Sequence, residues 1–221
     1  MVKRLGTQHD DFLNTFTARL LLLLESRCLV EEGVYRSVVD HVLAPYWRDF
    51  PGHESDFVPA FLANDILRLW RTLCVNYEAR TRQEPIEEKA KRRLKNYKLK
   101  HSRLLTCFSA ILMLLAVHSR GGTVVPDDAR EMVRRTPTER LGWIADLLPG
   151  SGSKCDAVIA AYEQFLAATA KPEAELLAAF RAAAAPNLIG GPEGAESLGK
   201  AVFEAIGAVG GGSRFHRLLL V

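Results

Sequence analysis

An unusually long stretch without helix breakers limits the fold more than any other feature of this chain. No proline or glycine occurs from Ile86 to Ser119, and Gly121-Gly122 follows. These 34 residues predict a single helix about 50 Å long, at 1.5 Å per residue. Its first half is basic, and its second half is apolar nearly all round. We therefore expect the second half to lie in a core and the first half to project beyond it.

Helical periodicity continues through most of the remaining sequence. Further helices are expected over residues 10–28, over 31–49 with a break at Pro45, and over 56–79. Two short helices should follow, one after Pro126 and one from Thr136 to Leu148, where Thr136 and Glu139 have the spacing of a capping box. The sequence thus predicts an all-α fold: a bundle of four main helices with additional short helices.

The composition changes near residue 150. Pro149 to Ser153 read P-G-S-G-S, and residues 157–185 then contain 13 alanines in 29 positions. This pattern favours a boundary between a helical bundle (1–149) and an Ala/Gly-rich helical extension and tail (150–221). In the extension we expect two helices, a loop over 186–194, a last helix over 195–209 and a tail ending at Leu218 to Val221.

Cysteine spacing and hydropathy indicate a cytoplasmic protein. The four cysteines lie 46, 33 and 48 residues apart, so no close pair suggests a metal site or a redox motif: Cys28, Cys74, Cys107 and Cys155. We expect buried thiols in a reducing compartment. The longest nearly apolar stretch, Leu104 to Val117, has 14 residues, whereas a membrane crossing needs about 20. No membrane association is expected.

Positive charge is concentrated in the middle of the chain. The net charge is +3, yet residues 84–120 carry nine basic and three acidic side chains. Eight of the basic residues fall between Lys89 and Arg103. Such a cluster favours an anionic partner, RNA included, with Tyr97 as a stacking surface, or a set of counter-charges.

Polar residues share one face on each of two consecutive helices. If the helices pack antiparallel, these faces could form a cleft for a phosphate-bearing ligand. This cleft requires Arg68, Arg71, Lys100 and Arg103 to converge. A structural ion-pair network, or a solvated face, would explain the same pattern. The candidate ligand-binding residues are Asn64, Asp65, Arg68, Arg71, Asn76, Lys95, Asn96, Lys98, Lys100 and Arg103.

A second functional interpretation concerns Arg36 and His41. Their spacing resembles the ribonuclease motif of HEPN domains, which are also small helical bundles. Five residues on a helix leave the two side chains about 140° apart. The two side chains could meet only through local distortion of the helix or across a second subunit. The ribonuclease interpretation predicts that they converge across a homodimer.

Two segments resemble a known group. Residues 62–78, L-A-N-D-I-L-R-L-W-R-T-L-C-V-N-Y-E, and 95–109, K-N-Y-K-L-K-H-S-R-L-L-T-C-F-S, are similar to the helical C-terminal region of uncharacterised bacterial nucleotidyltransferase-like proteins. The similarity covers about residues 8–148. It implies a preceding catalytic domain with a Gly-Ser turn and an Asp-x-Asp pair that binds Mg²⁺. This chain has no Asp-x-Asp sequence.

The sequence therefore predicts a substrate-binding or accessory module that is not catalytic as an isolated chain, either a split subunit or a truncated nucleotidyltransferase. Its expected ligand is a nucleotide or another phosphate-bearing molecule. No catalytic or metal-binding residue is assigned, and Mg²⁺ would be required only together with a catalytic domain. The expected protein partner is that domain or a second copy of the chain. The alternatives are the HEPN-like ribonuclease and a non-catalytic protein-interaction bundle.

Overall fold

The computed structural model describes residues 15–78, 86–182 and 192–220, and within these ranges it contains helices and no strand. This confirms the all-α prediction. The elements are α2 Thr15–Glu25, α3 Glu32–Leu43, η2 Ala44–Trp47, α4 Ala60–Glu78, α5 Ile86–Gly121, α6 Pro126–Arg134, α7 Pro137–Leu147, η3 Pro149–Ser151, α8 Gly152–Thr169, α9 Glu173–Ala182, α10 Pro192–Gly210 and α11 Arg214–Leu220.

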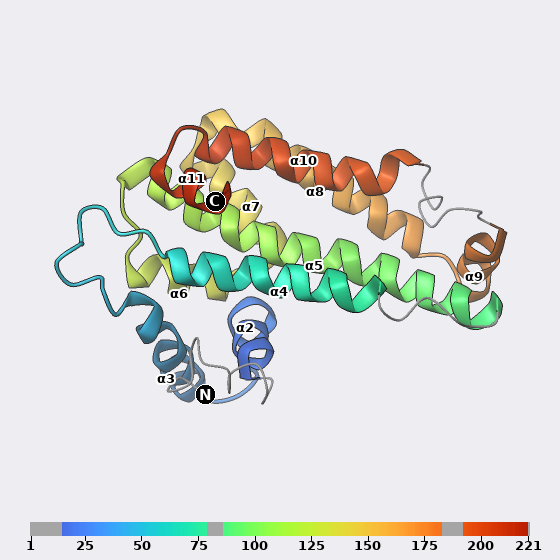
Figure 1. Ribbon diagram of the computed structural model, residues 1–221, viewed down its shortest axis with the longest axis horizontal. Coiled ribbons are helices and arrows are strands. Elements are labelled where there is room, and N and C mark those ends of the chain that lie inside the picture. Colours follow the sequence, from blue (N-terminus) through green and yellow to red (C-terminus); the bar gives the residue numbers. More distant parts are fainter. Residues whose placement is uncertain (1–14, 79–85, 183–191, 221) are drawn as a thin grey trace.

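The long helix α5 forms the axis of the molecule (Figure 1). Helix α4 runs antiparallel along one side of α5, and α8 and α10 lie on the other. Every side chain from Ala110 to Ala116 has no solvent exposure, as expected for an apolar half enclosed on all sides. Helix α7 also packs on α5. Four helices, α4, α7, α8 and α10, pack around α5. The predicted bundle of four main helices is not confirmed by this arrangement and stays a prediction.

The basic half of α5 does not project freely, contrary to expectation. Its inward face packs Leu94 and Tyr97 against Phe165 of α8 and Phe180 of α9, forming a second small core. Figure 1 shows α9 beside the beginning of α5. The lysines of this half lie on other faces and are exposed. One helix segment can thus be basic and still pack, because the cations and the apolar residues occupy different faces.

Helices beyond the predicted boundary share the main core with those before it. Cys155 and Val158 of α8, and Leu198 and Val202 of α10, are buried in the same cluster as the apolar half of α5. At Gly210, a Cβ atom would lie 2.4 Å from Leu115 Cδ2, so a larger residue would force the buried Leu115 side chain or α10 to shift. The predicted tail is helical as α11, with Phe215 buried. The predicted loop lies outside the described residues up to position 191, and residues 192–194 belong to α10.

The second predicted helix is divided as expected, but its buried face differs in part from the prediction. Helix α3 ends at Leu43, and Pro45 lies in the short 3-10 helix η2. The apolar pattern of this segment predicts one buried face with Val34, Val38, Val42 and Trp47. Val42 and Trp47 are buried, whereas Val34 and Val38 are 62% and 44% exposed. Val39 and Leu43 are buried in their place. The start predicted for the first helix, near Asp10, lies outside the described residues.

Among the described residues, two arginines are fully buried and connect the helices. Arg140 of α7 has no solvent exposure. Its guanidinium donates hydrogen bonds to Met132 O at 2.9 Å, Leu24 O at 3.2 Å and Thr106 O at 3.4 Å. Burial lowers the pKa of Arg140 to about 10. Backbone carbonyls of three helices therefore satisfy this cation. The second, Arg19, is described with the candidate site.

Within the described residues, α5 is the one helix with the length and apolar composition that a membrane span requires. However, 67% of its most apolar window is buried against other parts of the chain. This arrangement is typical of the core helix of a folded domain.

Candidate functional site

A groove lies between the C-terminal half of α4 and the basic half of α5. It has a volume of about 770 Å³, within the usual range for small-molecule sites. Four of the ten predicted ligand-binding residues line it: Asn76, Lys95, Asn96 and Arg103. Arg92, Leu73 and Leu99 complete the lining. The residues of α5 recur every three or four positions, so they form one continuous face toward α4.

The lining of the groove is positively charged. Its described residues contribute three cationic side chains and two carboxamides, and none of these described residues is acidic. The Lys95 side chain is exposed, whereas Arg92 and Asn96 are half-buried. The groove can therefore offer cations and amide donors to an anion from one helix face, with Leu73 and Leu99 as apolar walls.

Arg103 stands at the end of the lining nearest to α2. Its guanidinium forms an ion pair with Glu25, the last residue of α2. The two side chains are 22% and 30% exposed, so water does not fully screen the pair. An anion bound at this end of the groove would compete with Glu25 for Arg103.

Asp65 has a structural role and does not line the groove. Its Oδ2 accepts hydrogen bonds from Tyr46 Oη at 2.7 Å and from Arg19 Nη2 at 3.2 Å. Arg19 has no solvent exposure and also donates from Nε to Tyr46 Oη at 2.8 Å. Burial, followed by the charge of Asp65, raises the pKa of Tyr46 above its usual range. Asp65 thus belongs to a structural ion-pair network, which was the alternative explanation of the polar faces. Its partner is Arg19 of α2.

Five further candidates lie outside the groove. The Arg68 guanidinium lies 4.4 Å from the centroid of the Phe16 ring, a cation–π contact. Asn64 and Arg71 of α4 are exposed, as are Lys98 and Lys100 of α5. Of the four cations that the predicted cleft required to converge, Arg103 alone lines the groove. The groove thus contains part of the predicted set, and the convergence of all four cations in one cleft stays a prediction.

Arg92 is the cationic lining residue that sequence reasoning did not select. It belongs to the basic run but was not assigned to the site. Its position, three residues before Lys95 and four before Asn96, places it on their face of the helix. That register could have identified it.

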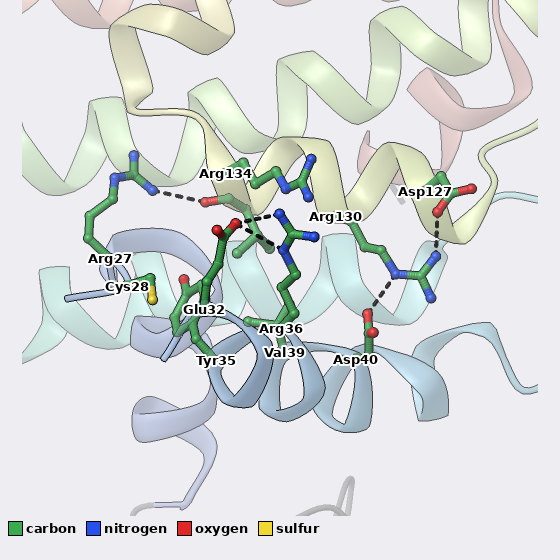
Figure 2. Close-up of a pocket in the computed structure, with 11 residues that line it drawn as sticks. Arg27, Cys28, Glu32, Tyr35, Arg36, Val39, Asp40, Asp127, Arg130 and Arg134 are labelled. Atoms are coloured by element: carbon green, nitrogen blue, oxygen red, sulfur yellow. Dashed lines mark hydrogen bonds and ion pairs between the residues drawn. The ribbon is translucent and has the colours of Figure 1, made fainter. Parts of the chain in front are cut away.

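The HEPN-like pair is not brought together within one chain. Arg36 Nε donates to Glu32 Oε1 at 2.9 Å, and Arg36 lines a different cavity, between α3 and α6 (Figure 2). His41 is exposed in the last turn of α3 and does not line that cavity. Convergence across a homodimer stays a prediction.

The thiols and carboxylates form no metal site in the part of the chain that the structure describes. No group of three or more His, Cys, Asp or Glu side chains is placed there to hold an ion. Cys107 and Cys155 are buried as predicted, and burial raises their pKa values to about 12 and about 11. The prediction is wrong for Cys28 and Cys74, which are only partly buried.

No protein-family model, curated protein or solved structure matches this chain. The interpretation of the groove therefore rests on its own residues and their chemistry.

Proposed function

We propose that this chain is a helical substrate-binding or accessory module that holds a phosphate-bearing ligand, such as a nucleotide, in the α4–α5 groove. The observation that carries the proposal is the lining itself, in which Arg92, Lys95 and Arg103 share one face of α5 together with the carboxamide of Asn96, and Asn76 of α4 adds a second carboxamide. Phosphate oxygens accept hydrogen bonds from guanidinium, ammonium and carboxamide groups, all of which the groove offers.

The proposal assigns binding to this chain and bond-making to a separate catalytic unit. The sequence lacks an Asp-x-Asp pair, and two-metal phosphoryl or nucleotidyl transfer depends on carboxylates of that kind. The resemblance of residues 62–78 and 95–109 to the helical region of nucleotidyltransferase-like proteins supports the same division. In such an assembly, Mg²⁺ would belong to the catalytic unit.

A nucleotide titration tests the proposal. We would titrate the chain with ATP, CTP, GTP and UTP by calorimetry at two salt concentrations, with and without Mg²⁺. Lys95→Ala should weaken the binding of the preferred nucleotide about tenfold, because a charge-assisted contact is lost. Lys98→Ala is the matched control, since Lys98 is an exposed lysine of the same helix outside the groove. Equal affinities of the two variants, or no nucleotide binding by the parent chain, would contradict the proposal.

A substitution in the Glu25–Arg103 pair should change the nucleotide affinity in the opposite direction. Glu25→Gln removes the carboxylate that competes for Arg103, so affinity for the nucleotide should rise several-fold. A weaker or unchanged affinity would show that the ligand does not reach Arg103.

A further inference from the structure

A second cavity, separate from the α4–α5 groove, lies between α3, α6 and the segment that joins α2 to α3. Its volume is about 460 Å³. Four of its lining residues are arginines, namely Arg27, Arg36, Arg130 and Arg134. Figure 2 shows their side chains entering the cavity from elements far apart in the sequence. Clustered guanidinium groups are costly to bring together unless anions compensate them.

The acidic lining residues compensate only part of this charge. Arg130 is held by Asp40, with Nε and Oδ1 2.6 Å apart, and by Asp127. Arg36 is held by Glu32. Among the described residues, these three carboxylates are the acidic groups that line the cavity. Four cations thus face three anions, two of which are engaged by the same arginine.

Arg27 and Arg134 are paired with none of the carboxylates in the described part of the lining. Arg27 Nη1 donates to the carbonyl of Val133 at 2.9 Å. Arg134 Nη1 lies 3.7 Å from Glu131 Oε2, but Glu131 is outside the lining and makes a closer contact of 2.6 Å with Arg135. Donors of Arg134 therefore remain for a ligand in the cavity.

The side chains of Arg134 and Arg36 reach into the same part of the cavity, from α6 and α3 respectively (Figure 2). Tyr35, Val39 and Val133 supply an apolar wall next to them. We infer that this cavity is a second anion-binding site, in which Arg134 and Arg36 hold the phosphate or carboxylate group of a small molecule. The apolar part of that molecule packs on Tyr35 and Val39. The inference does not depend on the proposed function of the α4–α5 groove.

Phenyl phosphate and benzoate are suitable probes, because each joins one anionic group to a small apolar body. Binding is measured by calorimetry and by the chemical-shift changes of labelled arginine side chains. All variants in this experiment are made in a parent chain that carries Lys95→Ala, because this substitution weakens binding in the α4–α5 groove. A tighter complex with phenyl phosphate identifies a phosphate site, and a tighter complex with benzoate identifies a carboxylate site.

Arg134→Gln and Arg36→Gln should each weaken the preferred probe about tenfold, because each removes a charge-assisted contact. Glu32→Gln should strengthen binding, since it releases Arg36 from its internal partner. Arg48→Gln is the control: Arg48 is an exposed arginine that pairs with Asp49 outside the cavity. All four substituted side chains are largely exposed, so the variants should fold, which circular dichroism verifies.

Two results would overturn the inference. One is the absence of measurable binding of either probe to the Lys95→Ala parent. The other is binding that Arg134→Gln and Arg36→Gln reduce no more than Arg48→Gln does.

Discussion

At the scale of single residues, the same chemical groups have different roles according to their surroundings. Asp65 and Arg68 lie one turn apart on α4, and the sequence suggested one role for both. Asp65 pairs with the buried Arg19, whereas Arg68 stacks on Phe16. Both partners come from α2, some 50 positions earlier in the chain. The sequence pattern of α4 alone could not reveal these contacts, because they form only when α2 packs against it.

Asp65→Asn should destabilise the protein strongly. The substitution preserves the shape of the side chain but removes the negative charge that pairs with the buried Arg19 guanidinium at 3.2 Å. Removing one partner of a buried ion pair typically costs about 3–5 kcal/mol. Urea unfolding measures this loss. Asp49→Asn, which breaks a pair whose side chains are 76% and 62% exposed, should change the free energy of unfolding by less than about 0.5 kcal/mol. Similar unfolding of the two variants would contradict a structural role for Asp65.

His101 should make the packing of α5 on α8 sensitive to pH. Its ring stacks on Phe165 with the centroids 4.6 Å apart, and its Nε2 has no hydrogen-bond partner among the described residues. Burial, with a smaller effect of Lys100, lowers the pKa of His101 below 6.5. The unfolded chain therefore takes up this proton first as the pH falls. The stabilisation is complete above about pH 6.5 and is lost as the pH falls through the lower pKa of the folded state.

The test compares the unsubstituted chain, which is the parent here, with the variant His101→Phe, which retains an aromatic ring. Melting temperatures at about pH 7.5 and about pH 5 should differ less for the variant than for the parent. His118, whose pKa is also lowered by burial, titrates in both chains and does not affect the difference between them. An equal acid shift in the two chains would refute the assignment to His101.

At the scale of elements, helix ends were easier to predict than buried faces. The capping box at Thr136 and the division of the second helix at Pro45 are both confirmed. These are local effects, because capping hydrogen bonds and proline sterics involve only nearby residues. The prediction for the buried face of α3 is correct for Val42 and wrong for Val34 and Val38, because the valines of α3 cover two adjacent sides. Packing against α6 and η2 selects the side of Val39 and Val42.

Thr136→Ala should destabilise the start of α7 by about 1 kcal/mol. The Thr136 hydroxyl accepts a hydrogen bond from Glu139 N at 3.3 Å, and the Glu139 carboxylate accepts one from Thr136 N at 2.6 Å. The second bond lowers the pKa of Glu139. Chemical denaturation measures the loss, with Thr136→Ser as the control because it keeps the hydroxyl. The capping interpretation fails if serine costs as much as alanine.

At the scale of the whole molecule, the chain is organised around α5. Helices from both sides of the predicted boundary cover its apolar half. The basic half is covered in turn by α8 and α9 through the second small core. Alanine-rich helices can do this because small side chains permit a close approach, and a few large residues such as Phe165 and Phe180 fill the remaining space.

A chain limited to residues 1–149 should not fold cooperatively. Its truncation would expose the faces of α5 and α7 against which α8 and α10 pack. Each fully buried aliphatic or aromatic side chain exposed in this way costs about 1.5–3 kcal/mol. We expect one sharp thermal transition for the full chain. For the truncated chain we expect a broad transition with strong binding of a hydrophobic dye. A sharp transition of the truncated chain at nearly the same temperature would show that residues 1–149 are an independent domain.

The sequence by itself determined the helical class, most helix positions and the concentration of cations on α5. These follow from local propensity, periodicity and capping, which act over a few residues. Tertiary structure decided which residues of that basic stretch, Arg92 among them, face α4 and line the groove. It also decided that Asp65 serves the core and that the helices after residue 150 complete it. These outcomes depend on which helix faces meet, and that choice is set by packing between segments far apart in the chain.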